Sequence, residues 1–270
     1  MPTALVTGVS RGLGLAIAGQ LLAEGWAVCG ISREESPAWR ALVAAHPGRV
    51  EWRAVDLARP GDVEEIVFGQ WLARRPVHAL VSNAAIAYDD LISNLQLPPL
   101  ESMFAVNVFS PMALVRGAIR NMLLHDVPGS IVHVSSVTVE TGAKGLAMYA
   151  ATKGAIEAFS RGTAREWGSR GIRSNCVVPG YMETEMTATL TAEQRAKIHR
   201  RAALQQPTDP ASVAATVAFL LSEGPRNILA GRVQLTWPGG AGPGIPGGWP
   251  SPTRPSGRCW PFAWGHRLPG

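Results

Sequence analysis

Residues 3–25 read TALVTGVSRGLGLAIAGQLLAEG and place an apolar run, a glycine-rich turn and a helical pattern one after another. The run before Gly8 predicts a buried strand, and the apolar spacing of residues 13–25 predicts an amphipathic helix. Gly8, Gly12 and Gly14 permit backbone geometry that a Cβ would prevent. A glycine turn that follows a strand and opens a helix predicts a phosphate-binding site, because the helix N-terminus presents N–H groups to an anion. The alternative is an ordinary strand-to-helix turn.

Short apolar runs alternate with amphipathic stretches along most of the chain. Continuous apolar runs that alternate with helices predict a parallel sheet covered on both faces. We therefore expect an α/β fold: a single doubly wound, Rossmann-type domain with a parallel seven-stranded sheet and helices on both faces. Ligands should bind beyond the carboxyl ends of the strands. The expected strands are residues 3–7, 26–31, 50–55, 78–83, 130–136, 172–178 and 232–237, and the helices include 13–25 and 62–75.

The composition changes abruptly near the C-terminus. Pro and Gly make up about half of residues 238–270. Prolines lack backbone donors and glycines cost entropy to order, so a packed element is not expected there. The sequence predicts a Rossmann-type domain over residues 1–237 and a Pro/Gly-rich extension, irregular or disordered, over residues 238–270. The alternative is that the tryptophans of the extension dock on the body or on a neighbour.

Composition argues against several classes of function. The net charge of +5 arises after Glu223, where five arginines and no acidic residue occur. The body is thus formally neutral, and no nucleic-acid-binding face is expected. The sequence contains no run of about eighteen uncharged apolar residues, so we expect no membrane span. The N-terminus does not have the pattern of a secretory signal, and none is expected. Three scattered cysteines predict neither a disulfide framework nor a metal site, and they favour a reducing cytoplasm.

The stretch MYAATKGA, residues 148–155, places a phenol and an ammonium four residues apart. On a helix, Tyr149 and Lys153 lie one turn apart on one face. A nearby positive charge favours phenolate, so we expect Lys153 to lower the pKa of Tyr149 from about 10. A phenol tuned in this way can act as general acid in a reduction and as general base in an oxidation. Ser136, at the end of an expected strand, can bind a substrate oxygen on which charge develops. On bare sequence, an ordinary amphipathic helix surface is the alternative.

Several motifs in the chain resemble those of the short-chain dehydrogenase/reductase family, and in the same order. They are the Thr-Gly-x-x-x-Gly-x-Gly turn at residues 7–14, N83-A-A, Asn107, Ser136, Y149-x-x-x-K153 and P179-G-Y-M-E-T184. The resemblance covers about residues 2–236. The stretches SRGIRSNCVVPGYMETEM and LTAEQRAKI are similar to those of the 3-oxoacyl-acyl-carrier-protein reductases.

The resemblance implies catalytic roles for Asn107, Ser136, Tyr149 and Lys153. Hydride would pass from a nicotinamide to a carbonyl carbon while Tyr149 protonates the oxygen. Lys153 would also hold the nicotinamide ribose, and Asn107 would position a water in a proton relay to that lysine. In the family the serine precedes the tyrosine by an offset that selects Ser136 rather than Ser135.

The resemblance also implies an NADP(H) site. An acidic residue at the end of the second strand would bind the ribose hydroxyls of NAD, whereas Arg33 stands there and Arg11 lies in the glycine turn. Both arginines can pair with a 2′-phosphate, with solvated surface charges as the alternative, and Glu34 or Glu35 can instead turn toward the ribose. Asp56 resembles an adenine-contacting aspartate, with a helix-cap or turn role as its alternative. The expected cofactor-binding residues are Gly8, Ser10, Arg11, Gly12, Leu13, Gly14, Arg33, Asp56, Leu57, Asn83, Ala84, Tyr149, Lys153, Pro179, Gly180, Met182 and Thr184.

Residues 184–205 are charged and alanine-rich and predict a helix, which in the resembling family is a mobile lid over the substrate cleft. Two features depart from the family pattern. Ala85 replaces a glycine after N83-A-A, which is tolerable only if its φ is negative. The C-terminal extension also differs, because family members end soon after the last strand.

Carrier-protein docking is weakly supported by the sequence. Arg170 matches one of two basic residues that carrier-protein reductases use for docking, but Val127 stands where the other would lie. Arg116 and Arg120 on the preceding helix can substitute in part, with solvated charges as the alternative.

These expectations lead to three functional hypotheses. The first is an NADPH-dependent ketoreductase that transfers a hydride to the carbonyl of a 3-oxoacyl thioester. The thioester can be attached to an acyl carrier protein, and the reaction would belong to fatty-acid or polyketide synthesis. The second is a carbonyl reductase or secondary-alcohol dehydrogenase for a free small-molecule ketone. The third is a non-catalytic NADP-binding protein, against which the complete Ser-Tyr-Lys set argues. The resemblance also implies a homo-oligomer, a dimer or a homotetramer.

Overall fold

The computed structural model describes residues 1–184, 187 and 190–236. All of these residues belong to one compact unit, Met1–Gly239. The extension predicted for residues 238–270 lies outside the described residues, and so does the last residue of the expected seventh strand.

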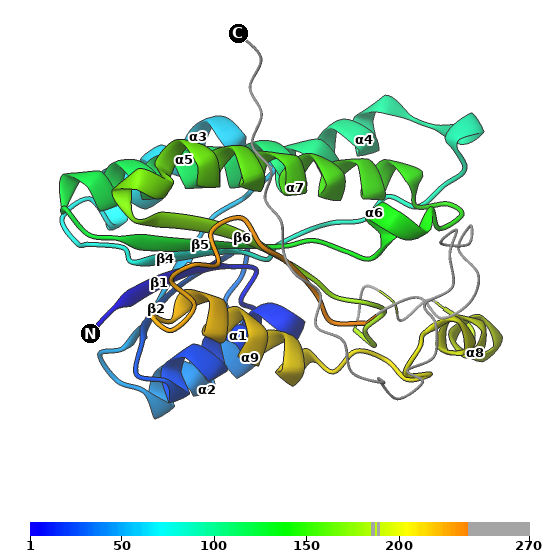
Figure 1. Ribbon diagram of the computed structural model, residues 1–270, viewed down its shortest axis with the longest axis horizontal. Helices are drawn as coiled ribbons and strands as arrows, with labels where there is room; N and C mark the ends of the chain where they lie inside the picture. The colour runs from blue at the N-terminus through cyan, green and yellow to red at the C-terminus, as the bar shows by residue number, and fades with distance from the viewer. Residues whose placement is uncertain (185–186, 188–189, 237–270) are drawn as a thin grey trace, which may run out of the picture. The chain divides into compact units, whose positions relative to one another are not determined.

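In the described part of the chain, seven parallel strands form one sheet in the order β3-β2-β1-β4-β5-β6-β7 (Figure 1). The predicted fold class is confirmed. The chain runs outward from β1 to β3 and then returns to place β4 on the other side of β1. This makes the β1/β4 junction the topological switch point, where such folds bind ligands. The strands are β1 Thr3–Thr7, β2 Ala27–Ser32, β3 Val50–Ala54, β4 Ala79–Ser82, β5 Gly129–Val134, β6 Ile172–Val178 and β7 Arg232–Gln234.

Helices cover both faces of the sheet (Figure 1). One face carries α1 (Gly12–Ala23), α2 (Pro37–Ala45) and α9 (Pro210–Leu221), and the other carries α3 (Pro60–Glu64), α4 (Leu97–Phe104), α5 (Ser110–Leu124) and α7 (Ala147–Trp167). Successive side chains of a strand point to opposite faces. Ala4 and Val6 therefore pack in one apolar cluster with residues of α1 and α9, whereas Leu5 packs in a second cluster with residues of α3 and α5. Because both faces are buried, the strands read as continuous apolar runs.

Residues Leu97–Leu124 form one helical segment in which a π-type turn, η3 (Ala105–Phe109), joins α4 to α5. By length and hydropathy alone this segment is able to cross a membrane. However, 61% of its most apolar window is buried inside the fold, where Leu114 and Met122 pack against Leu5 of the sheet. Its burial is that of a core helix.

The helix predicted for residues 184–205 is shorter than expected. It is α8, Ala192–Arg201. It begins there because Thr191 and Gln194 form a capping box: Thr191 Oγ1 accepts a hydrogen bond from the Gln194 N–H at 3.2 Å, and Gln194 Oε1 accepts one from the Thr191 N–H at 2.8 Å. Thr184 precedes the helix, so the longer prediction is wrong. The remaining short elements are α6 Thr138–Thr141, η1 Glu65–Trp71, η2 Ile92–Asn94 and η4 Gly168–Arg170.

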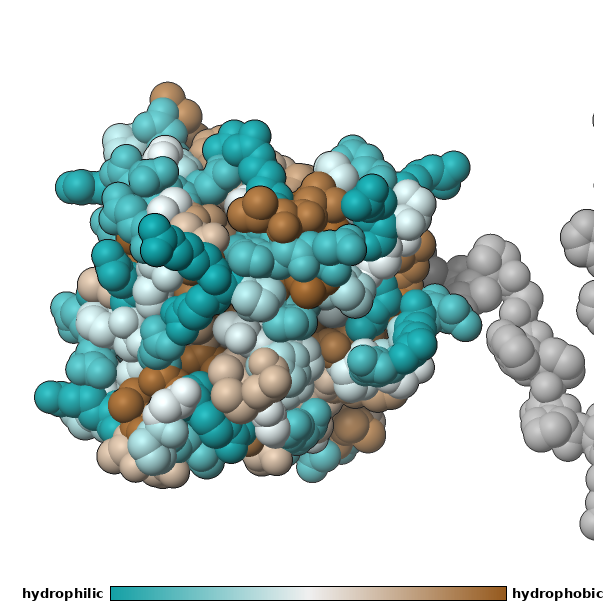
Figure 2. All heavy atoms as spheres, turned by 90° about the vertical axis from the view of Figure 1, so that its left-hand side faces the viewer, coloured by the Kyte–Doolittle hydropathy of each residue, from teal (hydrophilic) through white to brown (hydrophobic). Residues whose placement is uncertain are grey.

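The carboxyl ends of the parallel strands share one edge of the sheet. Gly8, Asn83, Ser136 and Gly180 follow β1, β4, β5 and β6 at this edge, which gathers the predicted site residues. The opposite side, where the strands begin, is shown in Figure 2; hydrophilic side chains dominate it, with smaller hydrophobic patches between them.

Candidate active site

The glycine turn after β1 has the backbone geometry that the sequence predicts. Gly8 (φ +74°) and Gly12 (φ +56°) lie in the left-handed region that favours glycine. A Cβ at Gly14 would overlap the Gly8 carbonyl oxygen and lie 2.6 Å from Asn83 Nδ2. Glycine is therefore required at position 14 for α1 to pack against the turn.

Thr7 and Asn83 join β1 to β4 across the switch point. Thr7 Oγ1 accepts hydrogen bonds from the backbone N–H groups of Asn83 and Ala84, both at 2.9 Å. Asn83 Nδ2 donates to the Thr7 carbonyl at 2.9 Å. Ala85 is not strained, because its φ is not positive. Asn83 and Ala84, predicted to bind the cofactor, thus also form the wall of the glycine turn.

The start of α1 fits a pyrophosphate. No side chain among the described residues caps this helix, and its first turn contains no acidic residue. Its first N–H groups therefore remain available to an anion, at the positive end of the helix dipole. Apart from its chain neighbours and the backbone of α1, no described atom lies within 4 Å of the point that a Cβ at Gly12 would occupy. Ser10 is half-buried beside it, whereas the Leu13 side chain is buried in the apolar core, which leaves the Leu13 backbone to face an anion.

The predicted 2′-phosphate site lies where β2 ends. The Gly8 N–H donates to the Ile31 carbonyl at 2.8 Å, so the end of β2 lies against the glycine turn. Arg33 follows β2 directly and is exposed, as is Arg11 in the turn. Their positions agree with the predicted pairing to a phosphate.

Asp56 and Leu57 have structural contacts of their own. Asp56 Oδ1 accepts a hydrogen bond from the Ala58 N–H at 3.0 Å, which is the turn role that the sequence left open. Leu57 is buried, and its carbonyl accepts a hydrogen bond from Ser110 Oγ at 2.6 Å. Contact of either residue with a cofactor stays a prediction.

Ser136, Tyr149 and Lys153 lie together beyond the carboxyl end of β5. Tyr149 and Lys153 are one turn apart on α7, and Lys153 Nζ lies 5.7 Å from the centre of the Tyr149 ring. The Ser136 side chain interacts with that of Tyr149 and favours its ionised form. The Lys153 side chain is buried and donates to the Val134 carbonyl at 2.8 Å. Because an ammonium has three donors, two remain for other partners.

The pKa of Tyr149 is raised rather than lowered. Burial raises it to about 12, and the interaction with Ser136 acts in the opposite direction. Burial also lowers the pKa of Lys153 to about 8. The expected lowering of the Tyr149 pKa is therefore wrong for this structure, because desolvation of the phenolate is the largest effect on it. At neutral pH the phenol is protonated.

Asn107 links the catalytic helix to the segment that follows β4. It lies in η3 and is 2% exposed. Its Oδ1 accepts from the Ile86 N–H at 2.9 Å, and its Nδ2 donates to the Ile86 carbonyl at 2.8 Å and to Thr152 Oγ1 at 3.1 Å. The amide is thus engaged in positioning, and π-type turns such as η3 are frequent at functional sites. The proton-relay role of Asn107 stays a prediction.

The segment after β6 borders the same edge. The Pro179 carbonyl accepts a hydrogen bond from the Val137 N–H at 3.1 Å, one residue beyond Ser136. Thr187 Oγ1 donates to the Met182 carbonyl at 2.9 Å and accepts from the Thr184 N–H at 3.1 Å. Thr187 therefore shapes the loop that contains the predicted cofactor-binding residues Met182 and Thr184, and nothing in the sequence pattern singled it out.

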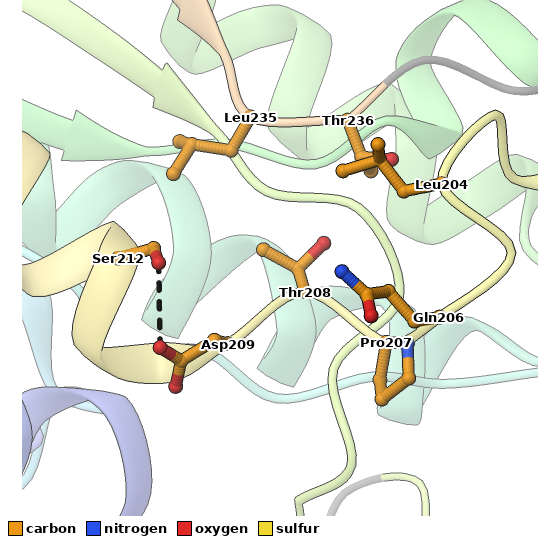
Figure 3. A pocket seen from close by; sticks show the side chains of 8 residues that line it. All are labelled: Leu204, Gln206, Pro207, Thr208, Asp209, Ser212, Leu235 and Thr236. Atoms are coloured by element: carbon orange, nitrogen blue, oxygen red, sulfur yellow. Dashed lines mark hydrogen bonds between the residues drawn. The ribbon is translucent and has the colours of Figure 1, made fainter.

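A small cavity of about 110 Å³ lies between residues 204–212 and the residues that follow β7 (Figure 3). It borders Gly180, since a Cβ there would overlap Thr236 Cγ2 and lie 2.9 Å from Thr208 Oγ1. It is separate from the Ser136–Tyr149 pair. Its lining residues are Leu204, Gln206, Pro207, Thr208, Asp209, Ser212, Leu235 and Thr236.

Sequence reasoning missed two further groups around the catalytic residues. Thr152 Oγ1 donates to the Tyr149 carbonyl at 2.7 Å and accepts from Asn107. Ser135 Oγ donates to Glu157 Oε1 at 2.6 Å. The available signal was helix periodicity, because Thr152 and Glu157 lie on the buried face of α7 with Lys153.

Comparisons with known sequences agree with this geometry. A family model described as enoyl-(acyl carrier protein) reductase matches residues 8–233. The 3-oxoacyl-[acyl-carrier-protein] reductase FabG of Vibrio cholerae serotype O1 is 34% identical, with 81% of this chain and 89% of that protein covered. The (3R)-3-hydroxyacyl-CoA dehydrogenase of Rattus norvegicus is 30% identical, with 86% and 94% covered.

Solved structures share the fold. A candidate NAD(P)-dependent gluconate 5-dehydrogenase from Beutenbergia cavernae, with bound NADP, superposes with a TM-score of 0.81 at 29% identity, covering 86% of this chain and 94% of that one. A blue fluorescent protein from a metagenomic library, in complex with NADPH, has a TM-score of 0.79 at 29% identity, covering 87% and 96%. From its motifs, its fold and these relatives, the chain belongs to the short-chain dehydrogenase/reductase family of oxidoreductases.

Proposed function

We propose that the protein is an NADPH-dependent ketoreductase that reduces the 3-oxo group of an acyl thioester. The observation that carries the proposal is the cluster of Ser136, Tyr149 and Lys153, in which Ser136 interacts with the Tyr149 side chain and Lys153 Nζ lies 5.7 Å from the centre of the phenol ring. This cluster lies at the same edge of the sheet as a glycine turn that fits a pyrophosphate.

The residues divide the work of reduction. NADPH, when bound, supplies the hydride. The hydroxyls of Ser136 and Tyr149 hold the carbonyl oxygen of the substrate as negative charge develops on it. Tyr149, with a pKa of about 12, is protonated at neutral pH and donates its proton to this oxygen, because an alkoxide is a stronger base than a phenolate. The Lys153 ammonium adds positive charge beside the site.

Arg33 and Arg11 support NADPH as the cofactor. Both are exposed, and a guanidinium is the side-chain group that best matches the geometry of a 2′-phosphate. Two relatives of known structure, each 29% identical to this chain, contain bound NADP or NADPH. We expect kcat/KM with NADPH to exceed that with NADH by about tenfold or more, since a charge-assisted pair contributes about 1.5–3 kcal/mol. Equal values for the two cofactors would contradict this choice.

The names of the relatives support a thioester substrate. Reductases of 3-oxoacyl-[acyl-carrier-protein] from Vibrio cholerae and Escherichia coli are each 34% identical to this chain. The rat (3R)-3-hydroxyacyl-CoA dehydrogenase shows that a similar chain acts on a coenzyme A ester. A 3-oxoacyl or 3-hydroxyacyl thioester is the substrate class common to these relatives.

The surface gives limited support for a carrier protein as the carrier of that thioester. Arg170 is exposed, but Val127 is half-buried and packs against the core. Arg116 and Arg120 both pair with Glu64, which reduces the positive charge they present. Moreover, Val127 and Arg170 precede β5 and β6, at the opposite edge from Ser136. A carrier docked there would face away from the active site of the same chain.

A second candidate is a dehydrogenase or reductase for a free hydroxy or oxo compound. It is favoured by the likeness to the candidate gluconate 5-dehydrogenase from Beutenbergia cavernae, at 29% identity and a TM-score of 0.81.

A substrate panel with NADPH absorbance as the readout tests the proposal. The panel contains acetoacetyl-coenzyme A, acetoacetyl-acyl carrier protein, a simple ketone such as cyclohexanone, and 5-ketogluconate. We expect the thioesters to have the highest kcat/KM. A higher value for a free ketone or for 5-ketogluconate would favour the second candidate, and absence of turnover with every compound would contradict both.

A further inference from the structure

A buried carboxylate lies one helical turn from Lys153 and takes no part in the proposed reaction. It belongs to Glu157 on α7, which is 5% exposed. A buried carboxylate is costly unless it is hydrogen-bonded and paired with a positive charge. Glu157 has both: Oε1 accepts from Ser135 Oγ at 2.6 Å, and Oε2 accepts from Arg232 Nε at 3.1 Å.

The first of these contacts ties the end of β5 to the catalytic helix. Ser135 immediately precedes Ser136, and it is 3% exposed. The neighbouring Val134 carbonyl is bound by Lys153 Nζ at 2.8 Å. Two successive residues before Ser136 are thus joined to α7, the helix that carries Tyr149.

The second contact extends the tie to the other side of Ser136. Arg232, in β7, also pairs through Nη1 with Glu140 at 3.1 Å. Glu140 lies in α6, which begins two residues after Ser136, and Thr138 of the same helix donates to Ser136 Oγ at 3.0 Å. One planar guanidinium therefore bridges a carboxylate on α6 and a carboxylate on α7. Its rigid, fixed donor geometry suits such a bridge.

We propose that Glu157 and Arg232 are positioning residues that hold Ser136 in place beside Tyr149. Glu157 acts through Ser135 and Arg232 acts through both carboxylates, and neither touches the substrate. The inference rests on the proposed ketoreductase function, because its measure is the rate of proton donation by the Ser136–Tyr149 pair.

Four variants test the inference on the full-length enzyme. Ser135→Ala and Glu157→Leu remove the tie, Glu157→Gln keeps an acceptor oxygen for Ser135 without the ion pair, and Arg232→Gln removes the guanidinium. We expect Ser135→Ala and Glu157→Leu to lower kcat by about tenfold or more, because a misplacement of about 1 Å costs on the order of a hundredfold. The KM for acetoacetyl-coenzyme A and the Kd for NADPH should change by about twofold or less, since binding contacts are retained. Glu157→Gln should retain most of the wild-type kcat. The kcat of Arg232→Gln should lie between those of Glu157→Gln and Glu157→Leu.

The matched control is Glu223→Gln. Glu223 pairs with Arg226 at 2.5 Å on the surface, where the two side chains are 88% and 75% exposed, and this variant should leave kcat unchanged. Thermal unfolding of every variant separates loss of fold from loss of position. If Glu157→Leu does not fold, Ser135→Ala, which removes one oxygen atom, decides the question alone.

Assaying the wild-type enzyme first distinguishes a failure of the proposed function from a failure of the positioning role. A wild-type enzyme without turnover on any thioester would contradict the proposed function. A wild-type enzyme that turns over, together with Ser135→Ala and a folded Glu157→Leu at full kcat, would overturn only the positioning role.

Discussion

Lys153 Nζ lies 5.7 Å from the centre of the Tyr149 ring and donates its hydrogen bond to the Val134 carbonyl. The ammonium thus lies beside the ring, while the tyrosine side chain also interacts with Ser136. The hydroxyl is the only part of Tyr149 that proton transfer requires, so its removal is the most direct test of the site.

Tyr149→Phe should lower kcat by about 10²–10⁴-fold, the usual contribution of a general acid. The ring is retained beside Lys153, so NADPH binding, measured by fluorescence titration, should change little. Turnover within about threefold of wild type would contradict the assignment, because a residual rate that high leaves no acid role for the phenol.

The rate of ketone reduction should fall as pH rises above about 8. Burial holds the pKa of Lys153 at about 8, so its positive charge is present below that pH and is lost above it. Tyr149, with a pKa of about 12, stays protonated over the same interval and does not cause the fall. Oxidation of the alcohol should instead rise with pH, because the phenolate form of Tyr149 must accept the proton of the alcohol. The check is the pH profile of kcat/KM in both directions, and a reduction profile that is flat through about pH 9 would oppose the role of Lys153.

Gly14→Ala should weaken NADPH binding and destabilise the fold by about 1–3 kcal/mol, since an added Cβ would overlap the Gly8 carbonyl oxygen. Gly19→Ala is the matched control on the same helix. No described atom outside that helix's own backbone lies within 4 Å of its added Cβ, so it should stabilise by about 0.5–1 kcal/mol. Chemical denaturation and NADPH titration measure the two effects. Equal behaviour of the two variants would contradict the close packing of the turn.

His133→Leu should make the protein more stable in mild acid. His133 is fully buried on β5, and neither ring nitrogen has a hydrogen-bond partner among the described residues. Burial lowers its pKa to about 3. The unfolded chain therefore binds a proton near pH 6.5 that the folded protein does not, and stability is lost as pH falls from about 6.5 toward 3.

The measurement for His133 is the difference between the unfolding free energies of wild type and variant at a series of pH values. As pH falls from about 6.5 toward 3, the unfolding free energy of His133→Leu should rise by several kcal/mol relative to that of the wild type. A difference that does not depend on pH would mean that His133 has the same pKa in the folded and unfolded states, which would contradict the prediction.

Much of the fold follows from local patterns in the sequence. The predicted strands 3–7 and 172–178 coincide with β1 and β6, because both faces of these strands are buried and their apolar runs end at polar turns. The seventh strand is shorter than predicted: β7 covers only Arg232–Gln234. It pairs with β6 at one edge of the sheet and lacks a second neighbour among the described residues, so fewer ladder bonds define its length.

The features that sequence reasoning missed depend on distant partners. Glu157 and Arg232 are 75 residues apart, and no local pattern pairs them. The direction of the Tyr149 pKa shift depends on how deeply the phenol is buried, which the spacing to Lys153 does not reveal. The geometry of the glycine turn, by contrast, is set by neighbouring residues and was predictable.

The contact between Gly180 and Thr236 limits how this enzyme can be re-engineered. The turn after β6 and the residues after β7 fit together only because position 180 has no side chain. A chimera that takes the loop at 179–184 from a relative must therefore import the matching tail of β7 in the same graft. Libraries aimed at new substrates should vary these two segments jointly.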